Sequence, residues 1–378
     1  MKILITGDFV ISKPYDPSLI DKHIINLFKT SNYNIVNLEA PVTKSDNKIL
    51  KTGPHLKSYK KSTLEALQHL NINITTLANN HIKDYDEQGV FDTIRFCKEN
   101  NIIPIGAGKD IEEASKTLTL DTDAGRIAII NIAENEWASA DIDSAGANGM
   151  NLIKDTRAIQ QAKKEHDYVF VIIHGGHEYY HLPSPRMQEQ YRFYIDQGAD
   201  LVVGHHPHAT SGYEIYNNSP IYYSLGNFLF TKDSVYDSWY EGLILEIDIH
   251  EGKLNHLVHP IKQAKNKFNL ELSENKEKIN TLDQIKEINN IISNKNLLNE
   301  AWSDLVDSRY NSYLNYWSPT NFIKSKLFNG VKNRLKVNFS NKKSLTLYSN
   351  LIRCESHLDL SKAVIKKRIE KNENSNSP

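Results

Sequence analysis

Short apolar runs alternate with stretches of helical periodicity over roughly the first 260 residues of the chain. The runs are rich in Ile, Leu and Val, as buried strands are, and the stretches between them carry apolar residues three and four positions apart. Strands separated by helices predict an α/β domain with helices on the faces of a sheet. The expected strands are 3–5, 35–38, 72–77, 102–105, 117–120, 126–132, 168–173, 201–203, 221–223, 243–249 and 254–258, and the expected helices include 19–28, 86–99 and 185–197.

Another helix is expected to begin at Ser62. The sequence Ser62-Thr63-Leu64-Glu65 has the form of a capping box, in which the serine and glutamate side chains bond to free amides of the first turn.

The composition shifts beyond about residue 262 to Asn, Lys, Ser and Glu, and glycine nearly vanishes. Helical periodicity returns over 281–292 and 297–316, which predicts a mostly helical appendage. The final polar and charged residues are typical of a disordered tail. We therefore expect an α/β domain over 1–262, a helical basic appendage over 263–369 and a disordered tail over 370–378.

The segment 319–343 combines an apolar stripe with basic side chains. One apolar residue recurs every four positions, and lysines stand alongside, in the series Ile323, Leu327, Val331 and Leu335. Two interpretations are open: the stripe packs on the α/β domain, as surface helices commonly do, or it lies on an anionic membrane surface. We favour packing and keep peripheral membrane contact as the alternative.

Composition excludes several classes of protein. The 378 residues are 39% hydrophobic, as in a globular protein with a real core, and the formal net charge of -1 argues against nucleic acid as a partner. The two cysteines, Cys97 and Cys354, form no metal-type pair and weakly favour a reduced protein. The apolar run at the N-terminus is too short for a signal peptide or an anchor. We expect a cytoplasmic location, with the inner face of the membrane as the place of any peripheral contact.

Polar residues of the metal-binding type stand where several of the expected strands end. Each has a structural alternative, such as helix capping by an aspartate, but five strand ends that all supply Asp, Glu, Asn or His favour a shared site at one edge of the sheet. Oxygen donors mixed with imidazoles suit one or two divalent ions of Mn, Fe or Zn, and the lack of thiolates argues against structural zinc. The residues are Asp8, Glu39, Asn80 with His81, His174, and His206 with His208.

Six motifs in order give the chain a resemblance to the poly-γ-glutamate capsule biosynthesis (CapA-like) family, of the calcineurin-like metallophosphoesterase superfamily. They cover about residues 1–260. The motifs are Gly7-Asp8, Asn37-Leu38-Glu39-Ala40-Pro41, Leu77-Ala78-Asn79-Asn80-His81 with Asp84-Tyr85, His174-x-Gly176-x-Glu178-Tyr179, Gly204-x-His206-Pro207-His208 and Ser224-Leu225-Gly226-Asn227-Phe228. The resemblance implies a four-layer α/β/β/α metallophosphatase-like sandwich with a metal site at the edge of two facing sheets.

The resemblance also implies roles for individual residues. His81 would protonate the leaving oxygen, and the ligands would be Asp8, Glu39, Asn80, His174, His206 and His208. Contact with substrate or support of the ligands is expected for Asn37, Glu178, Tyr179, His205 and Asn227, while His177, like His205, is an imidazole that the family does not require. The segment Lys51–His55 is either a cationic loop over the site or, as we favour, a solvated loop.

Two positions depart from the superfamily pattern. Val10 stands where the wider superfamily has a histidine ligand, and Glu39 stands where it has an aspartate. One ion is therefore expected to be weakly held, or absent.

The expected function is that of a metal-dependent hydrolase in capsule or exopolysaccharide biosynthesis, acting on an anionic small-molecule or polymer substrate. The alternatives are an accessory protein that binds an anionic envelope polymer without turnover, which Val10 favours, and a glycan-processing partner enzyme. The sequence leaves the oligomeric state open.

Overall fold

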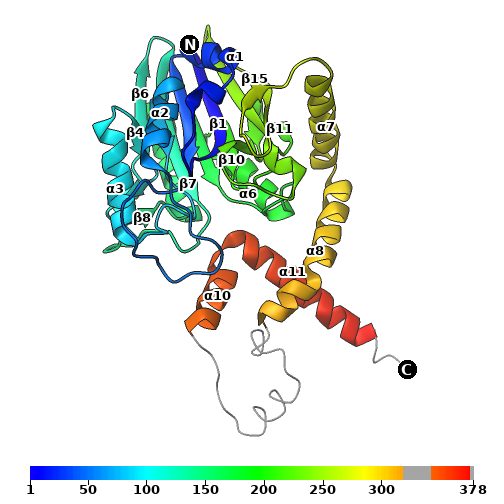
Figure 1. Ribbon diagram of the computed structural model, residues 1–378. Helices are drawn as coiled ribbons and strands as arrows, with labels where there is room; N and C mark the ends of the chain where they lie inside the picture. The colour runs from blue at the N-terminus through cyan, green and yellow to red at the C-terminus, as the bar shows by residue number, and fades with distance from the viewer. Residues whose placement is uncertain (318–341, 375–378) are drawn as a thin grey trace. The chain divides into compact units, whose positions relative to one another are not determined.

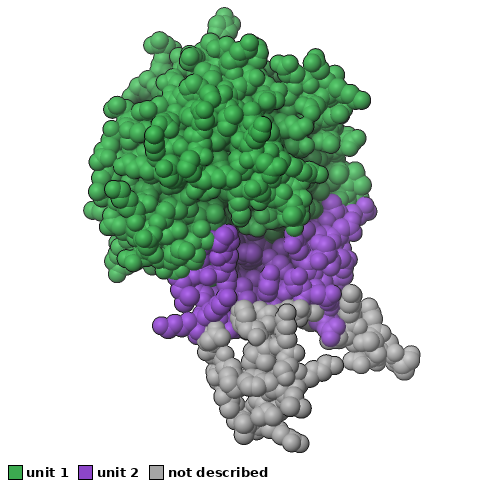
Figure 2. Space-filling view, viewed as in Figure 1, with its two compact units in different colours: residues 1–49, 55–298 green, residues 50–54, 299–378 purple. Residues whose placement is uncertain are grey.

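The computed structural model describes residues 1–317 and 342–374. The chain divides into two compact units, one formed by 1–49 with 55–298 and the other by 50–54 with 299–378 (Figure 2). The first unit contains both large sheets, and the second consists mostly of helices (Figure 1).

The first sheet has eight strands in the order β16-β15-β14-β1-β2-β3-β4, with β13 paired to β1. Neighbours among β1 to β4 run parallel, whereas β14, β15 and β16 are antiparallel. The strands are β1 (Lys2–Val10), β2 (Tyr33–Leu38), β3 (Ile74–Thr76), β4 (Ile103–Ile105), β13 (Asn227–Phe230), β14 (Glu241–His250), β15 (Lys253–Gln263) and β16 (Leu270–Leu272).

The second sheet has six strands in the order β11-β12-β10-β9-β7-β6, and its four central strands are parallel. A short pair, β5 (Ala107–Gly108) with β8 (Gly146–Ala147), stands apart from both sheets. The six strands are β6 (Leu118–Thr122), β7 (Gly125–Ala133), β9 (Tyr168–His174), β10 (Leu201–His205), β11 (Tyr213–Tyr216) and β12 (Ser219–Tyr222).

Alternation along the strands builds three apolar layers. In β1, Ile3 and Ile5 face a core shared with Phe170 of β9, whereas Leu4 belongs to a separate core on the other face of its sheet. Val171 of β9 likewise faces a third core, on the outer face of the second sheet. Because successive side chains of a strand point to opposite faces, each sheet is buried on both sides. The prediction of a four-layer α/β/β/α sandwich is confirmed.

Helices cover the two outer faces. The outer core of the first sheet includes side chains of α1, α2 and α3, and that of the second sheet includes side chains of α5, α6 and α7. These helices and one short turn are α1 (Lys22–Lys29), α2 (Lys60–His69), α3 (Asp86–Glu99), α4 (Ile111–Ala114), α5 (Leu152–Glu165), α6 (Pro185–Asp196) and α7 (Asn275–Ser293).

Strand β1 continues beyond the point where the sequence pattern ends it. The strand runs to Val10, with an irregularity in its pairing at Asp8, and its last residues pair with β13. This pairing needs a glycine, because a Cβ at Gly7 would stand 1.9 Å from the carbonyl oxygen of Gly226. Asp8 is therefore an interior residue of a strand and not the first residue after it.

The predicted capping box at Ser62 is wrong. Helix α2 begins at Lys60 with Tyr59 as its N-cap residue, which makes no side-chain cap. The Ser62 hydroxyl instead accepts a hydrogen bond from the backbone of Tyr15, at 3.0 Å. The Ser62 hydroxyl oxygen, which the local pattern assigned to a helix cap, is therefore used in a tertiary contact instead.

The boundary between the units lies later than the shift in composition. Helix α7 counts with the first unit because Ile285 and Ile292 are buried in its cores. The amide of Asn289 also accepts a hydrogen bond from the backbone of Tyr213, at 2.7 Å. The second compact unit takes in residues 299–378 with 50–54, and the predicted domain bounds remain a prediction.

The second unit has a small apolar core of its own, centred on Val306, Leu351 and Val364. Its helices are α8 (Lys295–Trp317), whose first residues belong to the first unit, α10 (Lys342–Arg353) and α11 (Glu355–Asn374). The predicted amphipathic segment 319–343 lies outside the described residues except at its last two positions. Among the helices that are described, none is both long enough and apolar enough to cross a membrane.

Candidate metal centre

The two sheets bring their carboxyl-terminal strand ends to one place. Asp8 comes from the end of β1, and Glu39 follows β2 directly. His174 ends β9, and His206 follows β10. Ligands in such folds gather where parallel strands end, because the loops there converge.

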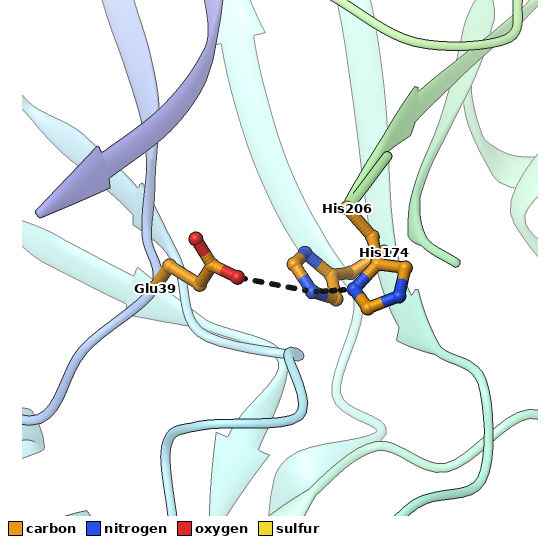
Figure 3. Close-up of side chains that lie close together, drawn as sticks. All are labelled: Glu39, His174 and His206. Atoms are coloured by element: carbon orange, nitrogen blue, oxygen red, sulfur yellow. Dashed lines mark hydrogen bonds and ion pairs between the residues drawn. The ribbon is translucent and has the colours of Figure 1, made fainter. Parts of the chain in front are cut away.

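Two overlapping groups of side chains could each hold an ion. Glu39, His174 and His206 form one group, and Asp8, Glu39 and His208 form the other; within each group the ligand atoms lie within 4.8 Å of one another. Figure 3 shows the first group, with Glu39 from one sheet facing His174 and His206 from the other. Glu39 Oε1 lies 3.6 Å from His174 Nε2, which lies 3.1 Å from His206 Nδ1.

The Glu39 carboxylate provides the test of whether these residues suit a cation. The residue is fully buried, and neither carboxylate oxygen has a hydrogen-bond partner among the described residues. A buried carboxylate without partners is costly, and a shared divalent ion would supply what both oxygens lack. The residues present therefore fit one or two divalent cations.

Three asparagines support the ligands. Asn37 donates a hydrogen bond to Asp8 Oδ1 at 2.6 Å, and the same amide nitrogen lies 3.1 Å from His174 Nδ1. Asn80 Oδ1 lies 3.1 Å from His174 Nε2, and Asn227 Oδ1 lies 3.0 Å from His208 Nδ1. Partners of this kind fix the orientation of imidazole and carboxylate ligands.

Burial and neighbouring charge shift the two carboxyl groups in opposite directions. Burial raises the pKa of Glu39 well above its usual range, and the charges of Asp8, Glu178 and Asp84 add to this rise against the effect of His208. Burial opposes the charge of Asp8 too, but the hydrogen bond and charge of His208 prevail and lower its pKa. Asp8 is thus the carboxylate that stays charged most readily.

The imidazoles divide in the same way. Burial, with the charge of His206 as the next contribution, lowers the pKa of His174 well below its usual range. Burial would also lower that of His208, but Glu39 and Asp8 outweigh it and raise the pKa to about 10. The two carboxyl groups beside His208 therefore favour its protonated form.

His81 lies beside the centre and is held by an aspartate. Its Nδ1 lies 2.6 Å from Asp84 Oδ2, and the same oxygen accepts a hydrogen bond from the backbone of Leu56 at 2.7 Å. An imidazole whose Nδ1 is fixed by a carboxylate presents its Nε2 in a defined direction. Asp84, three residues after His81, belongs to the motif quoted from the sequence, but the sequence interpretation gave it no role of its own.

The backbone is strained where the ligands are displayed. His206 has a φ of 96° and His208 a φ of 53°, and Tyr179 in the neighbouring loop has a φ of 61°. Positive φ angles in non-glycine residues are costly and concentrate at functional sites. The strain is consistent with a loop shaped for its side chains and not for its own stability.

Val10 occupies an apolar cluster beside His208. It is fully buried with Ala40, Phe230, Trp239 and Tyr240. The ring of Trp239 lies 4.8 Å from that of His208. Hydrophobic packing thus takes the position that the superfamily gives to another ligand.

The remaining predicted residues lie around these groups. The ring of Tyr179 is 6.3 Å from that of His208, and the exposed Glu178 acts on Glu39 only through its charge in the contacts described. His205 and His177 are buried but belong to neither ligand group in the described part of the chain. In the segment Lys51–His55, the ring of His55 lies 2.8 Å from the Ile49 carbonyl oxygen, and its role remains a prediction.

The sequence interpretation also missed a support beneath His174. The buried Glu134 accepts hydrogen bonds from the backbone of Gly176 at 3.2 Å and from Arg186 at 2.8 Å. Its own backbone N–H donates to the His174 carbonyl at 2.9 Å. Glu134 directly follows β7, so the strand-end signal that picked out Glu39 could also have picked out Glu134.

Comparisons with known proteins identify relatives. The sequence profile of the family described as bacterial capsule synthesis protein PGA_cap matches residues 2–232. A capsule biosynthesis protein CapA of Bacillus anthracis is 33% identical over 235 residues, which cover 58% of this chain and 57% of that protein. A PGA biosynthesis protein CapA of Bacillus subtilis (strain 168) is 33% identical over 250 residues, covering 62% and 66%. A probable polyglutamine synthesis accessory protein of Mycobacterium tuberculosis is 27% identical over 206 residues, covering 51% and 54%.

These alignments span between about half and two thirds of the relatives' own lengths. The profile match, in contrast, takes in more than half of this chain and every candidate ligand. The chain therefore belongs to the bacterial capsule synthesis protein family PGA_cap.

Proposed function

We propose that this protein is a metal-dependent hydrolase of the metallophosphoesterase type that acts in the synthesis of a capsule or another envelope polymer. The observation that carries the proposal is the buried Glu39 carboxylate, which lacks hydrogen-bond partners and is shared by both candidate ligand groups. The substrate would be an anionic small molecule or polymer.

The proposed cofactor is one or two divalent ions of Mn, Fe or Zn. His174, His206 and Glu39, with the nearby Asn80, would hold one ion, and Asp8, Glu39 and His208 the other. Bound ions would supply positive charge to a phosphoryl group and lower the pKa of water.

His81 would manage the proton on the leaving side. Hydrolysis joins the oxygen of water to phosphorus and breaks the bond to the alcohol oxygen, which then needs a proton. His81, held at Nδ1 by Asp84, can donate that proton from Nε2. The buried Asp84 also stabilises the imidazolium before the transfer.

The biological process is inferred from the names of relatives. Two are described as capsule or PGA biosynthesis proteins and a third as a probable accessory protein of polyglutamine synthesis. A role in making a polyglutamate-like envelope polymer or an exopolysaccharide agrees with all three.

The test is a panel of phosphomonoesters and phosphodiesters offered to the full-length protein with Mn²⁺. Wild type is compared with His206→Ala and His81→Ala, and with His250→Ala as a matched control, since the His250 side chain is 72% exposed and lies outside the centre. We expect turnover by wild type and the control, and a loss of about 10²-fold or more in the other two. Equal activity of wild type and all three variants would refute the proposed hydrolase activity.

The second candidate is an accessory protein that binds an anionic envelope polymer without turnover. The apolar cluster around Val10 favours it, because one ligand group lacks a histidine that the superfamily uses. Calorimetric binding of polyglutamate by the metal-loaded protein, with no turnover of any ester in the panel, would select this function.

A location at the inner face of the membrane is also a proposal. It rests on the basic residues of segment 319–343. Full-length protein in which Lys324, Lys326 and Lys332 are replaced by Glu should lose co-sedimentation with anionic liposomes. Equal sedimentation of wild type with anionic and neutral liposomes would remove the proposal.

A further inference from the structure

Aromatic side chains form a rim at one side of the metal centre. Tyr179 follows the β9 ligand His174 in the chain, and its backbone N–H donates to the Pro207 carbonyl at 2.7 Å, between His206 and His208. Its ring stacks on that of Tyr236, with centroids 4.3 Å apart and an interplanar angle of 25°. The rim is therefore fixed to the loop that carries two candidate ligands.

A second tie joins the rim to the centre through Asn227. Its side chain donates a hydrogen bond to the Trp239 carbonyl at 2.9 Å, and its oxygen lies 3.0 Å from His208 Nδ1. The Trp239 indole in turn donates to the Lys232 carbonyl at 3.0 Å, which fixes the start of the loop that carries Tyr236. A ligand bound at this rim would therefore lie next to Asn227, which contacts the candidate metal ligand His208.

The outer part of the rim is open to solvent. Tyr236 is 48% exposed and Val235 is 90% exposed, whereas Trp239 behind them is buried. An exposed aromatic pair beside a polar centre is a feature typical of binding sites. It is also at odds with a purely structural role, since an exposed ring contributes little to the core.

The charges around the rim do not suit a polyanion. The acidic Glu178, Asp233 and Asp237 are exposed on it and outnumber the exposed Lys232 and Lys265, and Lys265 is paired with Asp237 at 2.6 Å. Carboxylates repel an anionic chain but accept hydrogen bonds from hydroxyl groups. Flat aromatic faces stack on the C–H faces of a pyranose, so rings and carboxylates together suit a neutral molecule that is rich in hydroxyls.

We infer that Tyr179, Tyr236 and the adjoining loop 232–238 form a subsite for a sugar ring, which is the alcohol part of the phosphoester that the centre hydrolyses. This inference rests on the proposed hydrolase and adds the substrate class to it. The phosphoryl group would lie at the metal centre and the sugar against the exposed Tyr236 ring. The products would be the free sugar and phosphate.

The experiment compares three esters with the full-length, Mn²⁺-loaded protein: glucose 1-phosphate, glycerol 3-phosphate and adenosine 5′-monophosphate. Wild type should have a kcat/KM for the sugar phosphate about tenfold above that for glycerol phosphate, mainly through KM, as expected for one stacked ring. Tyr236→Ala should abolish this ratio, and Tyr236→Phe, which keeps the ring, should preserve it. Tyr168→Ala is the remote control, because Tyr168 begins β9 at the end opposite His174.

The outcomes separate the subsite from the proposed function. An unchanged ratio in Tyr236→Ala, or no preference in wild type, would overturn the subsite while the hydrolase stands. A stronger preference for the adenosine ester, lost in Tyr236→Ala, would replace the sugar with a nucleobase. If no ester is turned over, the hydrolase fails, and the same ratios are then taken from dissociation constants measured by calorimetry. Metal content equal to that of wild type shows that the variants keep the centre.

Discussion

The two ligand groups of the metal centre share Glu39 but are built differently. His174 and His206 come from one sheet, Asn80 Oδ1 lies beside His174, and the backbone N–H of Glu134 donates to the His174 carbonyl. His208 and Asp8, in contrast, stand against the apolar cluster that contains Val10 and Trp239. Both groups have asparagine partners, but the second also stands against an apolar cluster. We therefore expect the two proposed ion positions to differ in affinity, because different side chains lie behind their candidate ligands.

The largest effect is expected from Glu39→Gln, which removes the only ligand that the two described groups have in common. Loss of a partner outside the coordination shell already costs about 10–100-fold in metal affinity, so a shared ligand should cost more than about 100-fold at both positions. Calorimetry and elemental analysis measure this. Retention of one tightly bound ion would show that Glu39 is not shared.

Removing one histidine from each group separately should have unequal effects on metal affinity. His206→Ala is expected to remove the tighter ion, with about a 100-fold loss of affinity, whereas His208→Ala should remove only the weaker one. Titration with Mn²⁺, followed by calorimetry, resolves the two. Identical losses in both variants would mean that the positions are equivalent.

Val10→His places a histidine where the wider superfamily has a ligand, beside the group of Asp8, Glu39 and His208. We expect about tenfold tighter binding of the second ion and a lower Tm, because a polar ring replaces a packed valine. Val10→Ala serves as the control, with a lower Tm and no gain in affinity. A second ion bound no tighter by Val10→His than by wild type would indicate that the apolar cluster excludes the ring.

The smallest expected effect is the pH dependence of metal affinity. Burial raises the pKa of Glu39 and, against the effect of burial, the carboxylates raise that of His208 to about 10. Both groups must lose a proton to act as ligands, so affinity should rise with pH, by about tenfold per unit for each proton released. Calorimetry in buffers of different ionisation enthalpy counts the protons. If metal binding released no proton at neutral pH, the raised pKa values of Glu39 and His208 would be contradicted.

The sequence alone predicted most of the fold and named the residues that the structure gathers into the two candidate groups, because a polar residue at the end of an apolar strand leaves a local signal. His174 and His206 were found in this way. Glu134 was missed although it directly follows β7, and Trp239 was missed because its contact with His208 is made across the fold and follows no periodic pattern. The packing of α7 on the first unit is likewise hard to see in its sequence, since its polar composition conceals the two isoleucines that enter the cores.

The absence of a side chain at Gly7 has a wider consequence. The carbonyl of Gly226 fills the space where a methyl group would stand, and the same crossing aligns Asp8 with Asn227 in the paired strands. A larger residue at this point would push β13 outward and carry Asn227 and its attached loop with it. The hydrogen atom in place of a side chain at Gly7 thus sets the spacing between Asp8 and the aromatic rim, and alanine at this position should disturb both at once.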